Sequence, residues 1–388
     1  MPSPRLTRRA LLGGTGVVAA SALLAACSGG SGSSGGQGGT PSPGRGTTRS
    51  VADFGAVGDG VADDSAAIGR GLAATRDGDV LEFPAGRTYR HTGVVTVATP
   101  GVTLSGGGTL LADNERASAL RLVADRIVLS GLTLAVRATT RRWDGLDQHR
   151  LFIGAFGGIA VRGVTVTGSA AAGVFAQGAR QLVLDAVTVA DTRADGIHLT
   201  GGCRGVAVRS PRVSRSGDDG VAVVSYRSDK AVCSEITVSS PTVERTVGGR
   251  GVSVVGGTDI SYTDVTVTDS NAAAVYLACE GKPFDTRPTS RVTVTGGTLT
   301  GSNYNAAIDH GAVLVYAGAG SVSDVRVSGL TVTGTRPTAS RQVGVVTDNG
   351  GTLSGITFEK LTLAPSPQPY ASNAGAQCCT RAGWTITG

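Results

Sequence analysis

The chain has few aromatic side chains and no long run with helical periodicity. Phe, Trp and Tyr make up 4% of its 388 residues, whereas glycine occupies 60 positions. Helical repeats would need apolar runs with a period of 3.6 residues, and the sequence has none. The spacing of cysteines and histidines matches no zinc site. These absences exclude a helical solenoid and argue against one globular core of large side chains.

Instead, short strand-like segments with alternating Val and Thr recur in three series. The first series has steps of 23, 24, 31 and 23 residues and starts at Gly173, Gly196, Gly220, Gly251 and Ala274. The other two series are Val166, Val189, Val213, Val243, Val267 and Val161, Leu184, Val208, Val238, Tyr262. Three short strands per repeat predict an all-β fold, a right-handed parallel β-helix solenoid.

The first 27 residues carry an export signal. Arg8 and Arg9 form a twin-arginine pattern before an apolar segment that is too short for a membrane span. That segment ends in Leu24-Ala25-Ala26-Cys27, which resembles the bacterial lipobox, where the cysteine receives lipid. The alternative is an ordinary cleavage site with an incidental thiol. We expect an exported bacterial lipoprotein, held through Cys27 at the outer face of the cell membrane.

Residues 28–50 consist mainly of Gly, Ser, Pro and Thr, and we expect a flexible tether before a catalytic domain at 51–388. The formal charge of +6 falls to +3 without the three arginines of the leader, so it argues weakly for nucleic acid. A mildly basic surface is compatible with an acidic polysaccharide. We expect a monomer with a polysaccharide substrate and no nucleic-acid partner.

Five cysteines follow Cys27. Cys203 and Cys233 both come after strands in neighbouring coils, so a disulfide between them is expected in an exported protein. Cys279 is expected to pair with Cys378 or Cys379, because adjacent cysteines rarely bond to each other. The odd number leaves at least one thiol unpaired.

A short helix is predicted from Ser65 to Ala74, with Ile68 and Leu72 on one face. It would cover the exposed end of the solenoid. The Asp63-Asp64 pair can cap this helix and is therefore interpreted as structural.

Three aspartates occupy nearly the same place in two successive repeats: Asp195, Asp218 and Asp219. Asp195 and Asp219 each precede a predicted strand by one residue, so they should stack roughly 4.8 Å apart. Like charges this close raise the pKa of at least one carboxyl, which then holds a proton at mildly acidic pH. Such a group can protonate a glycosidic oxygen while the others activate water. The structural alternative for Asp218-Asp219-Gly220 is a turn.

Three further residues are predicted to contact substrate. His198 lies early in its strand and should face the same groove as the aspartates. Arg250 stacks next to Asp219, where it binds substrate, neutralises the carboxylates or does both. Tyr276 offers a ring for sugar stacking, although an exposed tyrosine on a strand is also ordinary. Weaker candidates for the groove wall are the insert 143–150 and Asp309-His310.

The segment from Asp53 to Asp64 resembles the opening of the pectate-lyase-like β-helix superfamily, Asp-Phe-Gly-Ala-x-Gly-Asp-Gly-x-x-Asp-Asp. Further along, the chain resembles polygalacturonase-type glycoside hydrolases. Those enzymes carry Asn-Thr-Asp-Gly, Gly-Asp-Asp, Gly-His-Gly and Arg-Ile-Lys on successive coils. The corresponding segments here are Arg193-Ala194-Asp195-Gly196, Gly217-Asp218-Asp219, Gly249-Arg250-Gly251 and Tyr276-Leu277-Ala278.

This resemblance implies an inverting hydrolase of a pectin-like or other acidic glycan. Asp218 would be the general acid, and Asp195 with Asp219 the general base pair. The basic residues expected to hold a uronate carboxylate are absent: arginine, Arg250, replaces the histidine of the third motif, and the fourth motif lacks both of its basic residues. We expect neither a cofactor nor a metal at this site.

Two other functions remain open. A polysaccharide lyase or epimerase on the same fold would use an arginine as base and the aspartates as a calcium site. A surface glycan-binding protein would have no catalytic activity. Hydrolysis gives new reducing ends, lyase action gives unsaturated uronates, and a binding protein gives neither.

Overall fold

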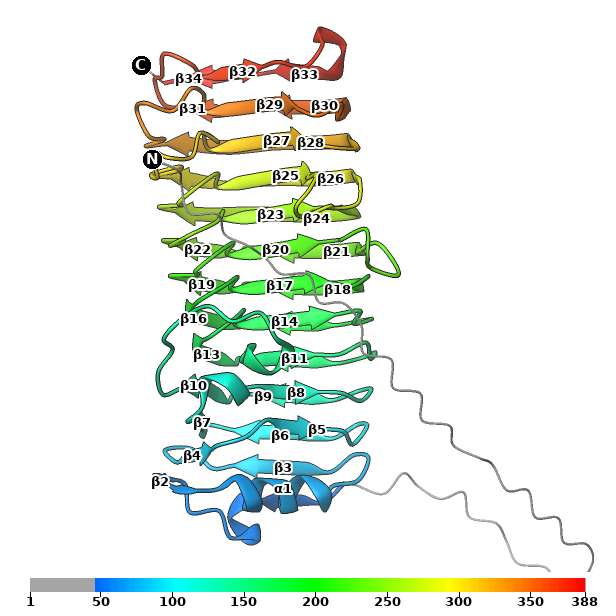
Figure 1. The fold of residues 1–388 in the computed structure, drawn as a ribbon, viewed down its shortest axis with the longest axis vertical. Helices are drawn as coiled ribbons and strands as arrows, with labels where there is room; N and C mark the ends of the chain where they lie inside the picture. Colours follow the sequence, from blue (N-terminus) through cyan, green and yellow to red (C-terminus); the bar gives the residue numbers. More distant parts are fainter. Residues whose placement is uncertain (1–45, 388) are drawn as a thin grey trace, which may run out of the picture. The chain divides into compact units, whose positions relative to one another are not determined.

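The computed structural model describes residues 46–387. Coils of short strands stack on one another in this part of the chain, with a helix at the N-terminal end (Figure 1). The first strand, β1 (Thr48–Ser50), pairs with β3 (Val80–Phe83), so residues 48–50 belong to the β-helix. The predicted boundary at residue 51 was therefore three residues too late. The signal and the lipobox Cys27 lie outside the described residues.

One parallel sheet contains 11 strands of the described chain, which come from successive coils. They are β5 (Val95–Val97), β8 (Leu120–Leu122), β11 (Leu151–Ile153), β14 (Val174–Gln177), β17 (Ile197–Thr200), β20 (Val221–Val224), β23 (Val252–Val255), β25 (Val275–Cys279), β27 (Val313–Ala317), β29 (Val343–Thr347) and β32 (Tyr370–Ser372). We call it the 11-stranded sheet.

The other sheet has 23 strands within residues 46–387 and contains two strand series. With β1 and β3, one series comprises β6 (Thr103–Gly106), β9 (Val128–Ser130), β12 (Ala160–Arg162), β15 (Val183–Asp185), β18 (Arg204–Arg209), β21 (Ser234–Ser239), β30 (Thr352–Glu359) and β33 (Cys379–Ala382). The second comprises β2 (Asp59–Asp63), β4 (Thr88–His91), β7 (Thr109–Ala112), β10 (Thr133–Val136), β13 (Thr165–Ser169), β16 (Thr188–Thr192), β19 (Arg212–Ser214), β22 (Thr242–Glu244), β31 (Thr362–Leu363) and β34 (Thr385–Ile386). Both series join in the long strands β24 (Gly257–Thr268), β26 (Thr289–Thr300) and β28 (Ser321–Thr333).

The registers confirm the right-handed parallel β-helix that the repeats predict. In the 11-stranded sheet Val174 pairs with Ile197, and the same file continues through Val221, Val252 and Val275. Val166, Val189, Val213, Val243 and Val267 form a second file. Val161, Leu184, Val208, Val238 and Tyr262 form the third. All of these side chains are buried, so the core is a continuous apolar column along the axis.

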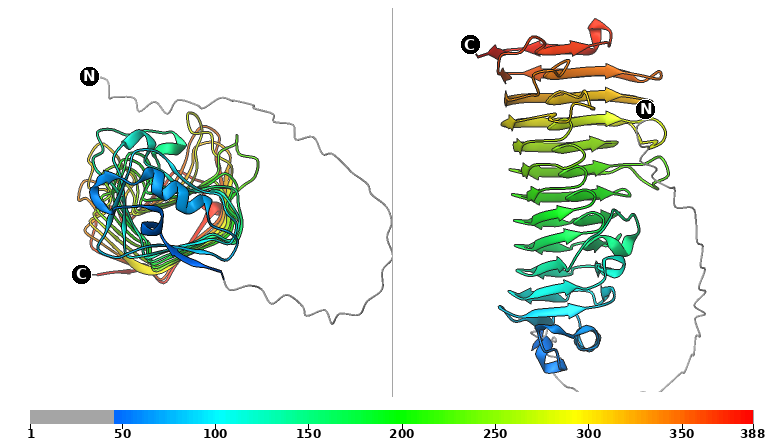
Figure 2. Two further views of the ribbon diagram at one scale, coloured as in Figure 1. Left: turned by 90° about the horizontal axis from the view of Figure 1, so that it is seen from below. Right: turned by 60° about the vertical axis from the view of Figure 1, so that its left-hand side comes forward.

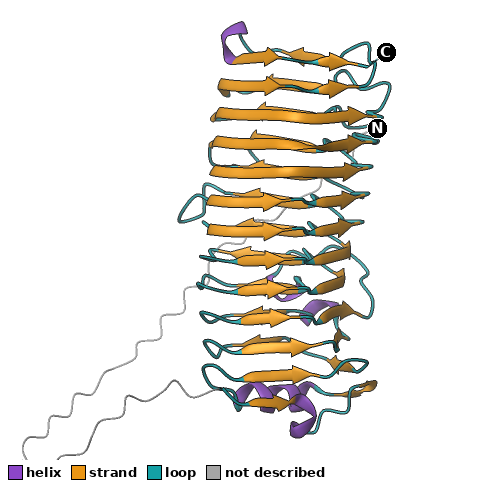
Figure 3. Cartoon of the chain, turned by 180° about the vertical axis from the view of Figure 1, so that it is seen from behind, coloured by secondary structure: helices purple, strands orange, loops and turns teal. Residues whose placement is uncertain are grey.

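The predicted capping helix is α1 (Ser65–Ala73), and it covers the N-terminal end of the column (Figure 2, left; Figure 3). Its Ile68 packs into the core. Asp64 is buried and accepts hydrogen bonds from the backbone N–H groups of Val57 and Gly58, at 2.7 and 3.1 Å. Asp64 is thus structural, as predicted, but its side chain holds the loop before β2 and makes no cap hydrogen bond to α1. Three 3₁₀ helices complete the loops, η2 (Glu115–Ala117), η3 (Leu146–Gln148) and η4 (Ala376–Cys378), and a fourth, η1 (Val51–Phe54), precedes β2.

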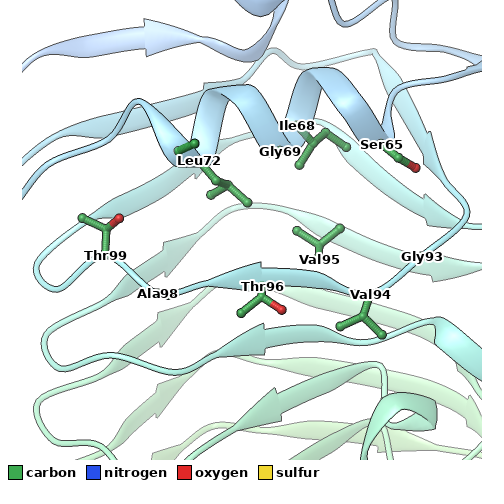
Figure 4. A pocket seen from close by; sticks show the side chains of 11 residues that line it. Ser65, Ile68, Gly69, Leu72, Gly93, Val94, Val95, Thr96, Ala98 and Thr99 are labelled. Carbon is green, nitrogen blue, oxygen red and sulfur yellow. The ribbon is translucent and has the colours of Figure 1, made fainter. Parts of the chain in front are cut away.

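A cavity of about 340 Å³ lies between α1 and β5 (Figure 4). Ile68 and Leu72 line it from the helix, and Val95 lines it from the strand. This cavity is built from the first coils, whereas the predicted catalytic aspartates lie in later coils. It is therefore a packing feature of the cap.

The predicted disulfide pairing is wrong. Cys378 and Cys379 are bonded to each other, and among residues 46–387 the cysteines Cys203, Cys233 and Cys279 are free and buried. Because Cys378 and Cys379 are bonded to each other, neither can pair with Cys279. In the same range, no helix has the length and apolar character needed to cross a membrane.

Candidate active site

The stacking of the coils places Asp195, Asp219 and Arg250 at equivalent points of three successive coils. The N–H of Gly196 donates to the carbonyl of Asp219 at 2.9 Å, and the N–H of Gly220 donates to the carbonyl of Arg250 at 2.8 Å. Each of the three residues immediately precedes the glycine before a strand of the 11-stranded sheet. The predicted ladder of two aspartates and an arginine is therefore present.

The three aspartates form one cluster. One carboxylate oxygen from each of Asp195, Asp218 and Asp219 lies within 4.8 Å of the others. The backbone N–H of Asp219 also donates to Oδ1 of Asp195 at 2.9 Å, which fixes the two coils relative to each other. Asp195 and Asp219 are buried, whereas the side chain of Asp218 is 18% exposed. Asp218 is thus the carboxyl that a substrate can approach most directly.

The spacing of these oxygens would also suit a cation, but the structure gives the cluster arginine partners. Arg142 reaches Asp218, and Arg250 reaches Asp219. Two guanidinium groups therefore neutralise part of the charge of the three carboxylates.

The surroundings of Asp219 raise its pKa. Burial, with contributions from Asp218 and Asp195, raises the pKa of Asp219 to about 6 against the lowering effects of Arg250 and Ser253. Its Oδ1 accepts the N–H of Arg250 at 2.8 Å, and its Oδ2 accepts the hydroxyl of Ser253 at 2.5 Å. The raised pKa lets this cluster hold a proton at mildly acidic pH.

His198 is held by the cluster. Its Nδ1 lies 2.6 Å from Oδ2 of Asp195, and its ring stacks on Phe175 with 5.0 Å between centroids. His149 stacks on the same Phe175 at 4.0 Å, and its Nδ1 accepts the N–H of Ala172 at 3.0 Å. Burial lowers the pKa of His149 to about 3, so it stays neutral. The structure therefore places His198 beside the aspartates, as predicted, but with its ring buried.

Gly249 packs directly against two of the carboxylates. A Cβ atom at this position would lie 2.3 Å from Oδ1 of Asp219 and 2.5 Å from Oδ1 of Asp218. A side chain here would have to displace both aspartates, because neither can retreat into the packed core. The absence of a side chain at residue 249 is thus a condition for the cluster.

Arg250 connects the cluster to a second buried polar group. Its guanidinium lies 3.6 Å from Asp219 and 3.1 Å from Glu280, and its Cζ lies 4.2 Å from the centroid of the Tyr276 ring. The hydroxyl of Tyr276 donates to Glu280 at 3.0 Å. Glu280 directly follows β25, four residues after Tyr276, and was not among the residues predicted for the site.

Tyr276 is not the exposed ring that was predicted to stack on a sugar. It is 2% exposed, because Arg250 covers it and the ring of His310 stacks near it at 5.4 Å. Asp309 lies in an ion pair with Arg341 at 3.0 Å. His310 therefore belongs to the packing around Tyr276, whereas Asp309 pairs with arginines.

Residues 137–150, between β10 and β11, stand out from the side of the stack (Figure 2, right). Arg142 in this segment reaches Asp218, and its Nη1 lies 2.8 Å from Oδ2. The sequence separation is 76 residues, so no local pattern connects the two. In the sequence, the only indication of this contact was the polar and aromatic composition of the adjacent insert, residues 143–150.

The other end of that insert does not line a groove. Arg150 is fully buried and donates to the carbonyls of Ser118 and Leu110, both at 2.7 Å. Trp143 is held between Arg116 and Arg141, whose Cζ atoms lie 4.8 and 3.9 Å from its ring centroid. The insert thus anchors the segment to the β-helix and presents Arg142 to the cluster.

The model of the family Rhamnogalacturonase A/epimerase, pectate lyase-like, matches residues 48–139. This range contains the opening segment and α1, and it ends before the aspartate cluster. The expected resemblance to the pectate-lyase-like superfamily is confirmed. A search of curated proteins found no match.

Solved structures with the same fold cover most of the chain. The catalytic unit of a GH87 α-1,3-glucanase from Streptomyces thermodiastaticus is 20% identical, with a TM-score of 0.62 over 90% of this chain and 70% of that one. An endo-xylogalacturonan hydrolase from Aspergillus tubingensis is 18% identical, with a TM-score of 0.60 over 86% and 98%. The A-module of a mannuronan C-5 epimerase from Azotobacter vinelandii is 17% identical, with a TM-score of 0.57 over 87% and 100%. At these identities the likeness establishes the parallel β-helix.

Proposed function

We propose that the protein is a glycoside hydrolase that cleaves an acidic polysaccharide. The observation that carries this proposal is the cluster of Asp195, Asp218 and Asp219, whose oxygens meet within 4.8 Å on two neighbouring coils. The hydrolases and the epimerase with the same fold support a carbohydrate-active enzyme.

In this mechanism Asp218 donates a proton to the leaving glycosidic oxygen, because it is the most exposed carboxyl of the cluster. Asp195 and Asp219 orient the attacking water and accept its proton. The ring nitrogen of His198 fixes the carboxylate of Asp195 for this role. Water adds to the anomeric carbon as the bond to the leaving oxygen breaks, so a new reducing end forms.

The separation of the carboxyls makes the stereochemistry informative. Inverting enzymes typically hold their two carboxyl groups roughly 6.5–9.5 Å apart, and retaining enzymes about 5–5.5 Å. The nearest oxygens here lie within 4.8 Å of one another, which is closer than the usual inverting arrangement. The resemblance implies inversion, and proton NMR of the first anomer released tests it directly.

The first experiment screens the purified domain against a panel of polysaccharides and analyses the products. New reducing ends without unsaturation support hydrolysis. Asp218→Asn should then lower the rate roughly 10²–10⁴-fold, the usual cost of removing a positioned acid. The matched control is Asp191→Asn, since the side chain of Asp191 is 48% exposed and pairs with Arg215, which is not a member of the cluster. Full activity of Asp218→Asn would refute the assignment.

A lyase or epimerase is the second candidate, because an epimerase module shares the fold and two arginines adjoin the aspartates. Unsaturated uronates in the product, or exchange of solvent deuterium into an uncleaved uronate chain, would replace the hydrolase proposal. Binding without any change in the glycan would identify a non-catalytic protein.

A further inference from the structure

Two arginines contact the aspartate cluster, and their surroundings differ. Arg250 lies between the buried side chains of Asp219 and Glu280, which are 6% and 12% exposed, and it covers the Tyr276 ring. Removing this guanidinium from either carboxylate would leave a buried charge unpaired, which is costly. Arg250 is therefore a fixed part of the site.

Arg142 is the arginine that can change its partner. Its side chain is 29% exposed and pairs with Asp218 at 2.8 Å and, more loosely, with Asp144 at 3.4 Å. Asp144 is 58% exposed, and Asp218 is the most exposed aspartate of the cluster. Because Asp144 is exposed and Arg142 and Asp218 are partly exposed, another anion can approach Arg142 from solvent.

The pair between Arg142 and Asp218 also poses a chemical difficulty. A general acid must point its carboxyl oxygen at the leaving glycosidic oxygen, whereas Nη1 of Arg142 occupies Oδ2 of Asp218 at 2.8 Å. The guanidinium must therefore move away from Asp218, or be drawn away, before Asp218 can act as the acid.

We propose that Arg142 is the specificity-determining residue of this site: it binds an anionic group of the substrate and thereby leaves Asp218. The planar guanidinium matches the two oxygens of a carboxylate, as in a uronate. Substrate binding then couples recognition of the negative charge to release of Asp218, whose Oδ2 becomes free to approach the glycosidic oxygen. This inference rests on the proposed hydrolase function.

The segment that carries Arg142 is built to hold it in place. Trp143, the next residue, donates its backbone N–H to the carbonyl of Ala170 at 2.8 Å. Arg193 reaches back to the same segment and donates to the carbonyl of Thr139 at 2.6 Å. Two anchors on either side of Arg142 leave its side chain, rather than the loop, to make the exchange.

The test compares an acidic polysaccharide that the enzyme cleaves with the same polysaccharide after chemical reduction of its carboxyl groups. Arg142→Gln should lower kcat/KM on the acidic substrate about 10- to 100-fold, the usual value of a hydrogen bond to a charged group. Its kcat/KM on the reduced substrate should stay the same or rise. Arg142→Lys should retain part of the preference for the acidic form.

Arg141→Gln is the matched control, because Arg141 lies in the same segment and stacks on Trp143 at 3.9 Å. It should leave the ratio of the two substrates unchanged. If Arg142→Gln lowers kcat/KM equally on both substrates, the proposal is overturned and Arg142 has only a positioning role. If Arg142→Gln changes kcat/KM on neither substrate, the proposal is overturned as well. Hydrolysis of neutral glycans alone would sink this inference while leaving the hydrolase function intact.

Discussion

Two opposing effects act on the pKa of Asp219. Burial favours the protonated form, whereas the N–H of Arg250 and the hydroxyl of Ser253 donate to it and favour the ionised form. The pKa of about 6 is the net result. A side chain in this state titrates near the mildly acidic pH at which the cluster would work.

The raised pKa of Asp219 predicts a fall in stability with rising pH. The folded state holds a proton between the ordinary pKa of 3.8 and about 6 that the unfolded chain releases. The contribution of this proton is therefore present below pH 4 and lost as the pH rises through 6. Relative to Asp219→Asn, the natural protein should lose on the order of 1–3 kcal/mol of unfolding free energy between pH 4 and 7.

Urea unfolding of both proteins across this pH range measures the difference. The mutation also alters hydrogen bonds to Arg250 and Ser253, which shifts the two curves by a constant amount. Only the pH-dependent part tests the prediction, and parallel curves would contradict it.

Gly249→Ala should abolish activity while the β-helix still forms. The new methyl group would fall 2.3 and 2.5 Å from oxygens of Asp219 and Asp218, so both carboxylates must shift. Crowding of this kind typically costs about 1–3 kcal/mol of stability. Gly93→Ala is the control, because a Cβ there meets nothing within 4 Å. Crystal structures of both variants and their rates on the cleaved polysaccharide give the comparison.

At the scale of elements, α1 contains a glycine, Gly69, whose replacement should stabilise the helix. Gly69 lies within the helix and borders the cavity between α1 and β5 (Figure 4), and a Cβ there meets nothing within 4 Å. Glycine inside a helix costs roughly 0.5–1 kcal/mol relative to alanine. Gly69→Ala should therefore raise the free energy of unfolding by about that amount.

Gly71 in the same helix provides the contrast. A Cβ at Gly71 would lie 3.2 Å from Leu81 and 3.3 Å from Phe54, so Gly71→Ala should gain less or lose stability. Denaturant titrations of the two variants separate helix propensity from packing. Equal gains from both substitutions would show that the crowding at Gly71 is unimportant.

The strands were predictable because their side chains repeat. The files that start at Val166 and Val161 follow the spacing in the sequence, since each coil must bury the same inward positions. The ladder of Asp195, Asp219 and Arg250 follows for the same reason. Within this regular part, position along the chain determines position in space.

The irregular segments were not predictable. Arg142 reaches Asp218 across 76 residues, through a loop whose path depends on contacts such as that of Arg193 with Thr139. The burial of Tyr276 depends on which side chains cover the strand, and alternation alone does not supply that information. The pairing of Cys378 with Cys379 was not predicted, because bonds between adjacent cysteines are rare and depend on a local backbone geometry that the sequence does not reveal.

At the scale of the whole molecule, we propose that the β-helix is exported and anchored through a lipid on Cys27. The twin arginines and the lipobox support this proposal. Cys27→Ser should release the protein from the membrane fraction or block its processing. Fractionation with mass spectrometry of the N-terminus provides the measurement, and retention of an unlipidated protein in the membrane would contradict the anchor.

The in-register stacking also decides which changes of length the protein tolerates. Each coil adds about 4.8 Å along the axis, and the cluster joins Asp195 on one coil to Asp218 and Asp219 on the next. A complete coil duplicated before β5 would lengthen the molecule and leave the cluster intact. A coil duplicated between Asp195 and Asp218 would move their carboxyls about two spacings apart, roughly 9.6 Å. Whole repeats can thus be gained or lost before the segment that carries Arg142 or after the coil of Glu280 without moving the contacts of the site, whereas a repeat inserted between these two places would separate some of them.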